Sequence, residues 1–345
     1  MNTTQRPIAV VAGAGGFIGR AIVEALATEG YELRLVGRAG PITWDDPAAL
    51  RDAVDGAAVV VNLAGKSVNC RYSDRNRDEI LRSRVHTTHA LAQAIAAADA
   101  PPPVWLNAST ATIYAHSTDR ANTEADGRIG SGFSVDVATS WEREFFTPDL
   151  PATRRVALRM AIVLGDGPAT RMLFGLARAG LGGPQFDGWC PPHHRYRGIG
   201  ERPTGSDRAP WYRTHGRQKF SWVHIDDVVA AVRFLRDTPS ISGVVNIASP
   251  APSDNRTLMR TLRRLTGGRI GLPATRWMLE VGMWVLRTEP ELILKSRWVL
   301  PGRLLDAGFA FAHTDLEAAL AESSAATRPR RATPAGPSAS ATAPR

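Results

Sequence analysis

Glycines cluster near the start of the chain, and their spacing indicates a phosphate-binding loop. Gly13, Gly15, Gly16 and Gly19 follow an apolar run and precede an amphipathic segment. A strand that turns sharply into a helix leaves backbone N–H groups and the positive end of the helix dipole facing outward, where a pyrophosphate can bind. Side chains at Gly13 and Gly16 would block that approach, and one at Gly19 would hold helix and strand apart. The alternative is a glycine-rich turn that binds no ligand.

Hydroxyl-bearing residues follow a second apolar run, residues 104–108. Ser109 and Thr110 come directly after this run, and Tyr114 follows shortly behind them. Ligands of a parallel α/β sheet bind beyond the carboxyl ends of its strands, so we expect Ser109 and Thr110 to face a ligand. The alternative is that both hydroxyls bond the end of the strand. Tyr114 also has two interpretations: it exchanges a proton with the ligand, or its ring packs beneath the ligand pocket as a structural residue.

The elements that must position these residues alternate between strands and helices. Short apolar, β-branched runs predict buried parallel strands at residues 7–12, 32–36, 41–44, 57–62, 104–108 and 154–164. Apolar residues at helical spacing predict helices at residues 20–29, 47–54, 74–98 and 133–146. This alternation predicts an α/β fold, a doubly wound parallel sheet of the NAD(P)-binding Rossmann type.

The remainder of the chain is expected to form a smaller C-terminal α/β substrate lobe. We place the Rossmann domain at residues 1–164, the lobe mainly at 165–322 and an unfolded tail, rich in Ala, Pro, Ser, Thr and Arg, at 323–345. Strands near 220–224 and 243–248 are candidates to rejoin the main sheet. The first of them leads into a helix that we expect Asp226 and Asp227 to cap, and two amphipathic helices follow near 257–265 and 274–287.

Residues 184–219 lack any apolar period. This segment contains six Arg and one Lys but only three acidic residues, so together with the tail it carries most of the net charge of +9. A long loop without apolar periodicity, most of it at residues 185–215, indicates either a functional lid or a disordered segment. A basic stripe across a folded face is not indicated, so we expect no nucleic-acid partner, although recruitment of nucleic acid by loop and tail is an alternative.

Composition bounds the location and the class of the protein. The 345 residues are enough for a large core, and the sequence has no apolar run long enough to cross a membrane. Its start shows no signal-peptide core, and two cysteines, Cys70 and Cys190, do not suggest a disulfide framework. We therefore expect a cytoplasmic protein with no membrane partner.

Several motifs together resemble one branch of the extended short-chain dehydrogenase/reductase superfamily. They are the glycine loop, Val61–Gly65, Ser83–Arg84, Gly180–Pro184, Phe220–Asp227, Val245–Asn246 and Leu300–Phe309. The branch is the sugar-nucleotide-epimerase-like one with a short C-terminal domain of unassigned function. The resemblance covers about residues 7 to 320, without most of 185–215, and implies an NADP-binding Rossmann lobe beside a small substrate lobe. It does not imply a particular substrate.

The expected cofactor is NADP. A carboxylate after the second strand would accept the ribose hydroxyls of NAD, whereas this chain has Arg38 there, which can hold a 2′-phosphate. We expect Asp45 to bind the adenine amino group and Arg84 either to reach a phosphate or to be solvated. The complete predicted cofactor set is Gly13, Gly15, Gly16, Phe17, Ile18, Gly19, Arg38, Asp45, Leu63, Ala64, Gly65 and Arg84.

The resemblance also implies a catalytic set that this chain lacks in part. The superfamily uses a Ser or Thr after the fifth strand, a Tyr about two dozen residues later and a Lys four residues beyond that Tyr. Thr110, with Ser109 beside it, matches the hydroxyl, but the other two positions fall near Phe133 and Val137, and no Tyr-x-x-x-Lys pair occurs anywhere. Hydride transfer at an alcohol carbon needs a proton donor, for which the candidates are Tyr114 and, from the long loop, Tyr212 or His215.

Two main functions remain open. The protein is an epimerase-like oxidoreductase acting on a small molecule, such as a nucleotide-linked sugar or another carbonyl or alcohol, or it binds NADP(H) without turnover as a sensor or scaffold.

Two further patterns have weaker interpretations. Cys190, His193 and His194 are too few for a defined metal site, so we predict no metal. Trp277, Val281, Trp284 and Val285 share one side of a helix, which favours the core of the small lobe over a homodimer face or a wall for an apolar substrate.

Overall fold

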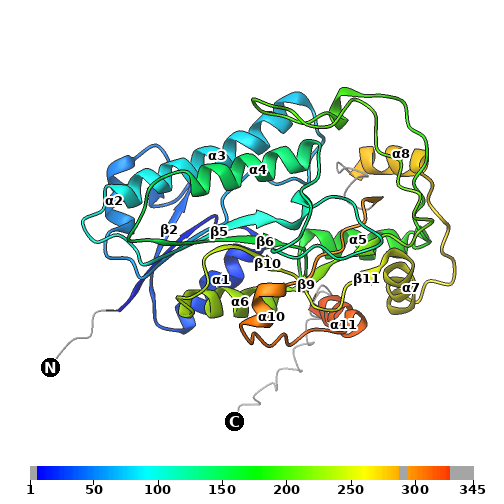
Figure 1. Cartoon of the computed structure of the whole chain (residues 1–345). Helices are drawn as coiled ribbons and strands as arrows, with labels where there is room; N and C mark the ends of the chain where they lie inside the picture. The colour runs from blue at the N-terminus through cyan, green and yellow to red at the C-terminus, as the bar shows by residue number, and fades with distance from the viewer. Residues whose placement is uncertain (1–5, 287–293, 327–345) are drawn as a thin grey trace, which may run out of the picture.

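A parallel β-sheet covered by helices on both faces forms the body of the molecule (Figure 1). The structure is a computed structural model and describes residues 6–286 and 294–326. The sheet has seven strands in the order β10-β6-β5-β4-β1-β2-β3, and every pairing within it is parallel. This architecture confirms the predicted doubly wound α/β fold.

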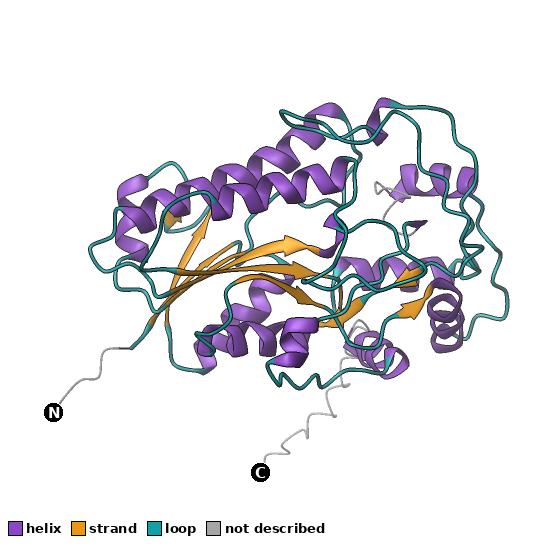
Figure 2. Cartoon of the chain, in the orientation of Figure 1, coloured by secondary structure: helices purple, strands orange, loops and turns teal. Residues whose placement is uncertain are grey.

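The elements of the main sheet and its covering layers follow the predicted order. The strands are β1 (Ile8–Ala12), β2 (Glu32–Gly37), β3 (Ile42–Thr43), β4 (Val59–Asn62), β5 (Val104–Thr110), β6 (Arg154–Met160) and β10 (Gly243–Ile247). The helices are α1 (Phe17–Thr28), α2 (Pro47–Val54), α3 (Asp74–Ala96), α4 (Phe133–Phe146), α6 (Ile225–Asp237) and α10 (Gly302–Asp306), and a short 3-10 turn, η1 (Ala111–Ile113), follows β5. Figure 2 shows α2, α3 and α4 on one face of the sheet and α1, α6 and α10 on the other.

The continuous apolar strands are explained by burial on both faces. Side chains alternate along a strand, so Ala9 and Val11 of β1 enter the core beneath α1 and α6, whereas Val10 and Ala12 enter the core beneath α2 and α3. All of these side chains are fully buried. Because both faces of β1 are covered, its side chains are apolar at every position, which is why its sequence shows a run and not an alternation.

A second, smaller core lies beside the carboxyl ends of the main strands. Its elements are the two-stranded sheets β7 (Ile162–Leu164) with β9 (Trp222–His224) and β8 (Lys219–Phe220) with β11 (Ser253–Asp254), and the helices α5 (Pro168–Arg178), α7 (Asn255–Thr266) and α11 (Leu316–Ala326). Leu173, Phe174, Trp222 and Leu262 are among its buried side chains. The strand predicted near 243–248 pairs with β6 in the main sheet, whereas that near 220–224 does not join it. Among the residues described, none of the helices combines the length and apolar character that a membrane crossing requires.

Three local predictions are wrong. The strand expected over 154–164 is two strands, because the backbone at Ala161 leaves β6, and β7 then pairs with β9. The helix after β9 is capped by His224, whose ring accepts a hydrogen bond from the Asp226 amide, while the Asp227 carboxylate instead accepts from the amides of Ala312 and His313. Finally, α11 continues past Ser323, which is buried in it, and residues 327–345 of the predicted tail lie outside the described residues.

The long basic loop at 185–215 is irregular apart from the 3-10 turn η2 (His194–Tyr196), and it is anchored to the helices beneath it. Arg77 of α3 donates hydrogen bonds to the carbonyls of Arg195, Arg197 and Gly198. The buried carboxylate of Asp136 in α4 accepts from the amides of Ile199 and Thr204, at 2.9 and 2.8 Å. Buried polar groups of the main domain therefore hold this loop in place.

Helix α8 (Arg276–Leu286) packs on its polar side against the long loop. Arg276 forms ion pairs with Asp187 at 2.8 Å and with Glu280 at 2.9 Å, and Glu280 also contacts Arg195. Trp277 and Val281 are 68% and 62% exposed, so the prediction that they belong to a core is wrong. The side chains of Trp284 and Val285 lie outside the described part of the structure.

Candidate functional site

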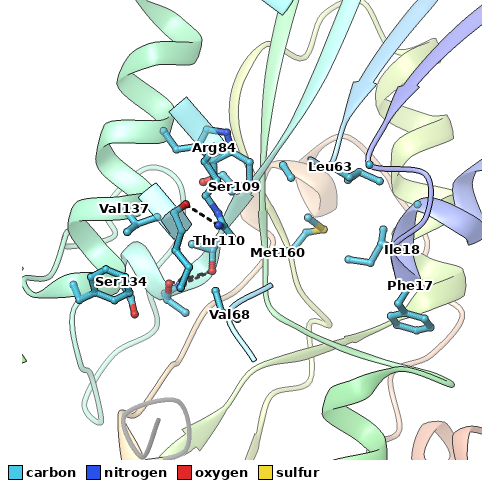
Figure 3. Close-up of a pocket in the computed structure, with 18 of the residues that line it drawn as sticks. Phe17, Ile18, Leu63, Val68, Arg84, Ser109, Thr110, Ser134, Val137 and Met160 are labelled. Carbon is cyan, nitrogen blue, oxygen red and sulfur yellow. Dashed lines mark hydrogen bonds between the residues drawn. The ribbon is translucent and has the colours of Figure 1, made fainter. Parts of the chain in front are cut away.

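The order of the strands reverses between β1 and β4, and a cavity of about 340 Å³ opens at their carboxyl ends. Such a switch point is where open α/β sheets bind ligands. Figure 3 shows Phe17 and Ile18 of α1 on one side of this first cavity and Ser134 and Val137 of α4 on the other. The remaining lining residues are Gly13, Gly16, Gly19, Leu63, Val68, Tyr72, Ile80, Arg84, Ala108, Ser109, Thr110, Thr112, Phe133, Trp141 and Met160.

The glycine loop forms one wall of the first cavity. Gly13 has φ +82°, and a Cβ there would lie 2.7 Å from the backbone carbon of Leu63, so only glycine lets the two loops approach. A Cβ on Gly19 would lie 2.3 Å from the Gly13 oxygen, so glycine at this position lets α1 pack closely against the loop that follows β1. The first turn of α1 has no acidic residue, and its amides lack partners within the helix. The helix end therefore offers several N–H donors and a positive dipole to an anion.

Arg84 supplies a cation on the opposite side. Its guanidinium donates to the carbonyls of Lys66 and Ile80, at 3.0 and 2.9 Å, and no carboxylate of the described residues pairs with it. Burial lowers the pKa of Arg84 to about 10, so the group stays protonated at neutral pH. A desolvated cation without a counter-ion is costly to bury, which favours an anionic ligand beside it.

Ser109 belongs to a buried network beneath the cavity. Its hydroxyl donates to Glu142 at 2.5 Å, and the two oxygens of Glu142 also accept a bidentate pair of bonds from Arg159, at 2.8 and 2.7 Å. Arg159 in turn donates to the Tyr114 hydroxyl at 2.9 Å, and that hydroxyl donates to Asn246 at 2.8 Å. The network ties β5, α4, β6 and β10 together.

The structure does not bring Tyr114 to the first cavity, because its fully buried hydroxyl points into that network. Burial raises the pKa of the Tyr114 phenol, against the opposing charge and hydrogen bond of Arg159. Tyr212 and His215 do not line the cavity either; Tyr212 stacks on His116 with ring centroids 4.1 Å apart. None of the three candidate proton donors therefore lies at this site.

Thr110 does line the first cavity and is half-buried at the end of β5. Its hydroxyl accepts from the Thr112 amide at 3.2 Å and contacts the Thr112 hydroxyl at 3.1 Å. Phe133 and Val137, which fall where the superfamily pattern has Tyr and Lys, both line the same cavity. These two positions of α4 are thus apolar, whereas Ser134 between them brings a hydroxyl to the same cavity.

The other predicted cofactor residues, Gly15, Arg38, Asp45, Ala64 and Gly65, are not among the residues that line the first cavity. Ala64 is buried and its amide donates to Asn62 Oδ1 at 3.0 Å, while a Cβ on Gly65 would lie 3.2 Å from the Arg84 side chain. Arg38 and Asp45 are exposed, after β2 and before α2. The hydrogen bond that Glu79 accepts from Lys66 at 2.6 Å lowers the pKa of the Glu79 carboxyl.

Sequence reasoning missed the Glu142–Arg159 pair and a further cavity, of about 230 Å³, that is lined in part by Lys295. An arginine inside the apolar run 154–164 was a signal, since a charged group in a buried strand requires a partner. Nothing in the sequence pointed to Glu142 as that partner. Of the candidate metal residues, His193 and His194 lie side by side with ring centroids 4.3 Å apart, and His194 lies 3.2 Å from Asp74. Cys190 instead contacts Tyr196 and Glu280.

Another group of possible ligands, His224, Asp226, His313 and Glu322, lies at the start of α6. The two imidazole rings lie against each other at a tilt of 31°, with centroids 3.9 Å apart, and each is next to a carboxylate. Burial, followed by the neighbouring His313, lowers the pKa of His224. These contacts cap α6 and link it to the segment before α11.

Comparison with known proteins gives matches along nearly the whole chain. A family model described as "NAD dependent epimerase/dehydratase family" matches residues 9–132, and one described as "Domain of unknown function (DUF1731)" matches residues 274–323. Epimerase family protein MT2273 of Mycobacterium tuberculosis is 31% identical over 336 residues, which are 93% of this chain and 98% of the relative.

Solved structures agree with this result. The crystal structure of human epimerase family protein SDR39U1 with NADPH is 29% identical, covers 91% of this chain and 98% of its own, and superposes with a TM-score of 0.74. MoeE5 in complex with UDP-glucose and NAD, at 21% identity and a TM-score of 0.66, shares the fold.

Proposed function

The chain belongs to the epimerase family, and on that premise we propose that it binds NADP(H) in the first cavity and transfers hydride between this cofactor and a small carbonyl or alcohol substrate. The observation that carries the proposal is that two groups able to bind an anion line the same cavity at the switch point of the sheet. They are the amino end of α1, whose first amides have no partner within the helix, and Arg84, with which no carboxylate of the described residues pairs. The human relative crystallised with NADPH supports the choice of cofactor.

The residues present fit a dinucleotide. The amides of the loop from Gly13 to Gly19, with Gly15, Gly16, Phe17 and Ile18 between them, would meet the pyrophosphate, and Arg84 would add a charge-assisted hydrogen bond. Leu63, Ala64 and Gly65 would lie against the adenosine. Asp45 would accept from the adenine amino group, and Arg38 would bind the 2′-phosphate and so favour NADP over NAD.

The nicotinamide, when bound, supplies or accepts the hydride. Thr110 would donate a hydrogen bond to the substrate oxygen, since Thr110 and its partner Thr112 both line the first cavity. Ser109 would act through Glu142, to which its hydroxyl is committed. Phe133, Val137 and Met160 would exclude water from the reacting carbon.

A second function, binding of NADP(H) without turnover, is favoured by one observation. The two cavity positions that would hold the Tyr and Lys of the superfamily pattern carry Phe133 and Val137, so the usual proton relay is absent from α4. A protein of this kind would sense the cofactor or act as a scaffold, with the residues around the pyrophosphate unchanged in role.

Cofactor titration with the Arg38→Asp variant tests the binding proposal. We expect NADPH to bind the wild-type protein more tightly than NADH, and the variant to bind NADPH roughly 10- to 100-fold more weakly, because a charge-assisted hydrogen bond is replaced by repulsion. An unchanged ratio of the two dissociation constants would refute the role of Arg38. Absorbance of NADPH with a panel of carbonyl compounds then separates enzyme from binder: tight binding without oxidation by any compound would favour the second function.

A further inference from the structure

Two histidines and two carboxylates from three separate segments meet at the start of α6. His224 caps this helix and Asp226 lies in its first turn, whereas His313 precedes α11 and Glu322 lies in α11. One ligand atom from each of the four residues lies within 4.8 Å of those from the other three. None of the four lines the first cavity, so this histidine cluster is separate from the proposed NADP(H) site.

The ring of His313 lies between two carboxylates. Its Nε2 atom is 3.2 Å from Glu322 Oε2, and its Nδ1 atom is 3.5 Å from Asp227 Oδ2. A neutral imidazole has one N–H and one lone pair, so whichever nitrogen carries the proton, the lone pair of the other faces a carboxylate oxygen. Nδ1 is buried and has no hydrogen-bond partner among the described residues. A cation between Nε2 and Glu322, with the proton on Nδ1 facing Asp227, removes this conflict.

His224 shows the same conflict. Its Nδ1 atom accepts a hydrogen bond from the Asp226 amide at 3.4 Å, so this nitrogen carries a lone pair. The Oδ2 atom of Asp226 nevertheless lies only 3.3 Å from the same nitrogen. The hydrogen bond is long and engages the lone pair weakly. A cation that accepts both lone pairs would therefore replace a weak cap with two stronger bonds.

The histidine cluster is also short of positive charge. In the part of the chain that the structure describes, no Lys or Arg pairs with Asp226 or Glu322. The buried Asp227 accepts from the amides of Ala312 and His313, and its other printed contact is the His313 ring. The amino end of α6 contributes roughly half a positive charge, which three carboxylates outweigh. This balance favours a bound cation.

The dimensions and the donor atoms of the cluster fit zinc. Bonds of about 2.0–2.2 Å place the ligands of a tetrahedral ion about 3.3–3.6 Å apart, close to the 3.2 and 3.3 Å found within the two His–carboxylate pairs. Asp226 and Glu322 are 61% and 58% exposed, so their side chains can rotate toward an ion that enters from solvent. Two imidazoles with two carboxylates suit Zn²⁺ better than Mg²⁺ or Ca²⁺, which prefer oxygen ligands.

We propose that His224, Asp226, His313 and Glu322 bind one Zn²⁺ ion, with Asp227 orienting the His313 ring from its other side. Four protein ligands leave no open position, so the ion is structural. It joins the start of α6, in the main domain, to the end of the C-terminal family domain that is matched over residues 274–323. Its binding energy therefore adds to the stability of the folded chain.

Calorimetric titration of the tag-free full chain with ZnCl₂ tests the inference, after dialysis against EDTA and then against buffer. We expect one saturable Zn²⁺ site per chain, with a dissociation constant in the micromolar range or below, and no saturable binding of MgCl₂. Zn²⁺ should also raise the thermal midpoint of unfolding, because it binds the folded chain. Co²⁺ in its place should give the strong visible absorption of a four-coordinate ion.

Variants of the ligands and of a second histidine pair show where the ion binds. Glu322→Gln and His313→Gln each remove a ligand, so the loss of Zn²⁺ affinity should exceed the roughly 10- to 100-fold that an altered second shell costs. His194→Gln is the matched control, because His194 also lies against a histidine and 3.2 Å from a carboxylate, but outside the cluster. Its Zn²⁺ affinity should equal that of the wild type. The exposed Glu322 decides the test if His313→Gln does not fold.

The inference is overturned if no saturable Zn²⁺ binding occurs in the micromolar range, which would mean that His313 is held between its carboxylates as an imidazolium. It is equally overturned if a folded Glu322→Gln variant keeps the wild-type affinity, if His194→Gln loses it, or if Mg²⁺ binds as tightly as Zn²⁺. NADPH titration is a separate measurement on the same protein, so failure of the zinc site and failure of the proposed function are distinguishable.

Discussion

Replacing Gly19 by alanine should destabilise the fold, although alanine is the better helix former. Gly19 lies in the first turn of α1, and its new Cβ would be 2.3 Å from the Gly13 oxygen and 2.9 Å from the Ala14 Cα. Both are backbone atoms that cannot rotate away, so the cost should be in the upper part of the roughly 1–3 kcal/mol typical of overpacking. The gain in helix propensity, about 0.5–1 kcal/mol, offsets only part of it. We expect a net loss of about 1–2 kcal/mol.

Gly175 provides the matched control. It lies inside α5 without positive φ, and a Cβ there would have no neighbour within 4 Å. Gly175→Ala should therefore raise the free energy of unfolding by about 0.5–1 kcal/mol through helix propensity alone. Urea denaturation, with the slope against urea compared among all three proteins, measures both changes. NADPH titration should show weaker binding for Gly19→Ala only, because the displaced loop carries the proposed pyrophosphate donors.

The reasoning is refuted if both variants shift stability in the same direction. A stabilised Gly19→Ala would mean that the α1 loop relaxes at no cost and that close packing does not require glycine there. A destabilised Gly175→Ala would mean that the exposed face of α5 has a constraint beyond helix propensity.

Three further predictions follow from the site and its surroundings. Tyr114→Phe should lower the free energy of unfolding, measured in urea, by about 1–3 kcal/mol, because Arg159 and Asn246 each lose a buried hydrogen bond to the hydroxyl. The NADPH affinity should be unchanged. Loss of turnover in a folded variant would instead restore a catalytic role for Tyr114. Arg84→Met should weaken NADPH binding roughly 10- to 100-fold. The control Arg82→Met, which removes an exposed arginine of the same helix, should have no effect. Equal NADPH dissociation constants for Arg84→Met and the wild type would exclude a cofactor role for Arg84. The free energy of unfolding of the metal-free wild type should fall as the pH drops below the ordinary histidine pKa of about 6.5, because the pKa of His224 is lowered in the folded state and the unfolded chain therefore takes up the proton first. His224→Asn should flatten this pH dependence, which urea midpoints measured across pH report. An unchanged dependence would show that other groups cause it.

Most of the main sheet and its helices were predictable because their signals are local. The apolar runs of β1, β4 and β5 and the helical periodicity of α3 and α4 occur within one element each, and burial on one or both faces imposes such patterns. The break at Ala161 was not predictable. The residues on either side of it are equally apolar, and only the pairing of β7 with β9 separates them from β6.

The candidate site was likewise predictable only where its signals are local. The glycine loop and the hydroxyls after β5 were visible, because a strand-to-helix turn and a strand end are features of adjacent residues. The commitment of Ser109 to Glu142, and of Tyr114 to Arg159 and Asn246, joins residues far apart in the chain. No pattern of types or spacing indicates which of two hydroxyls on neighbouring residues faces the cavity.

The sequence by itself determined the layered α/β fold and the place of the α1 amino end, because both depend on the conformational freedom of glycine and on apolar periodicity. Only the tertiary structure decided that Arg84 faces the first cavity with no carboxylate of the described residues paired to it and that Lys295 lies beside Thr112. The physical reason is that the cost of a buried charge depends on which distant groups surround it, and folding alone brings those groups together.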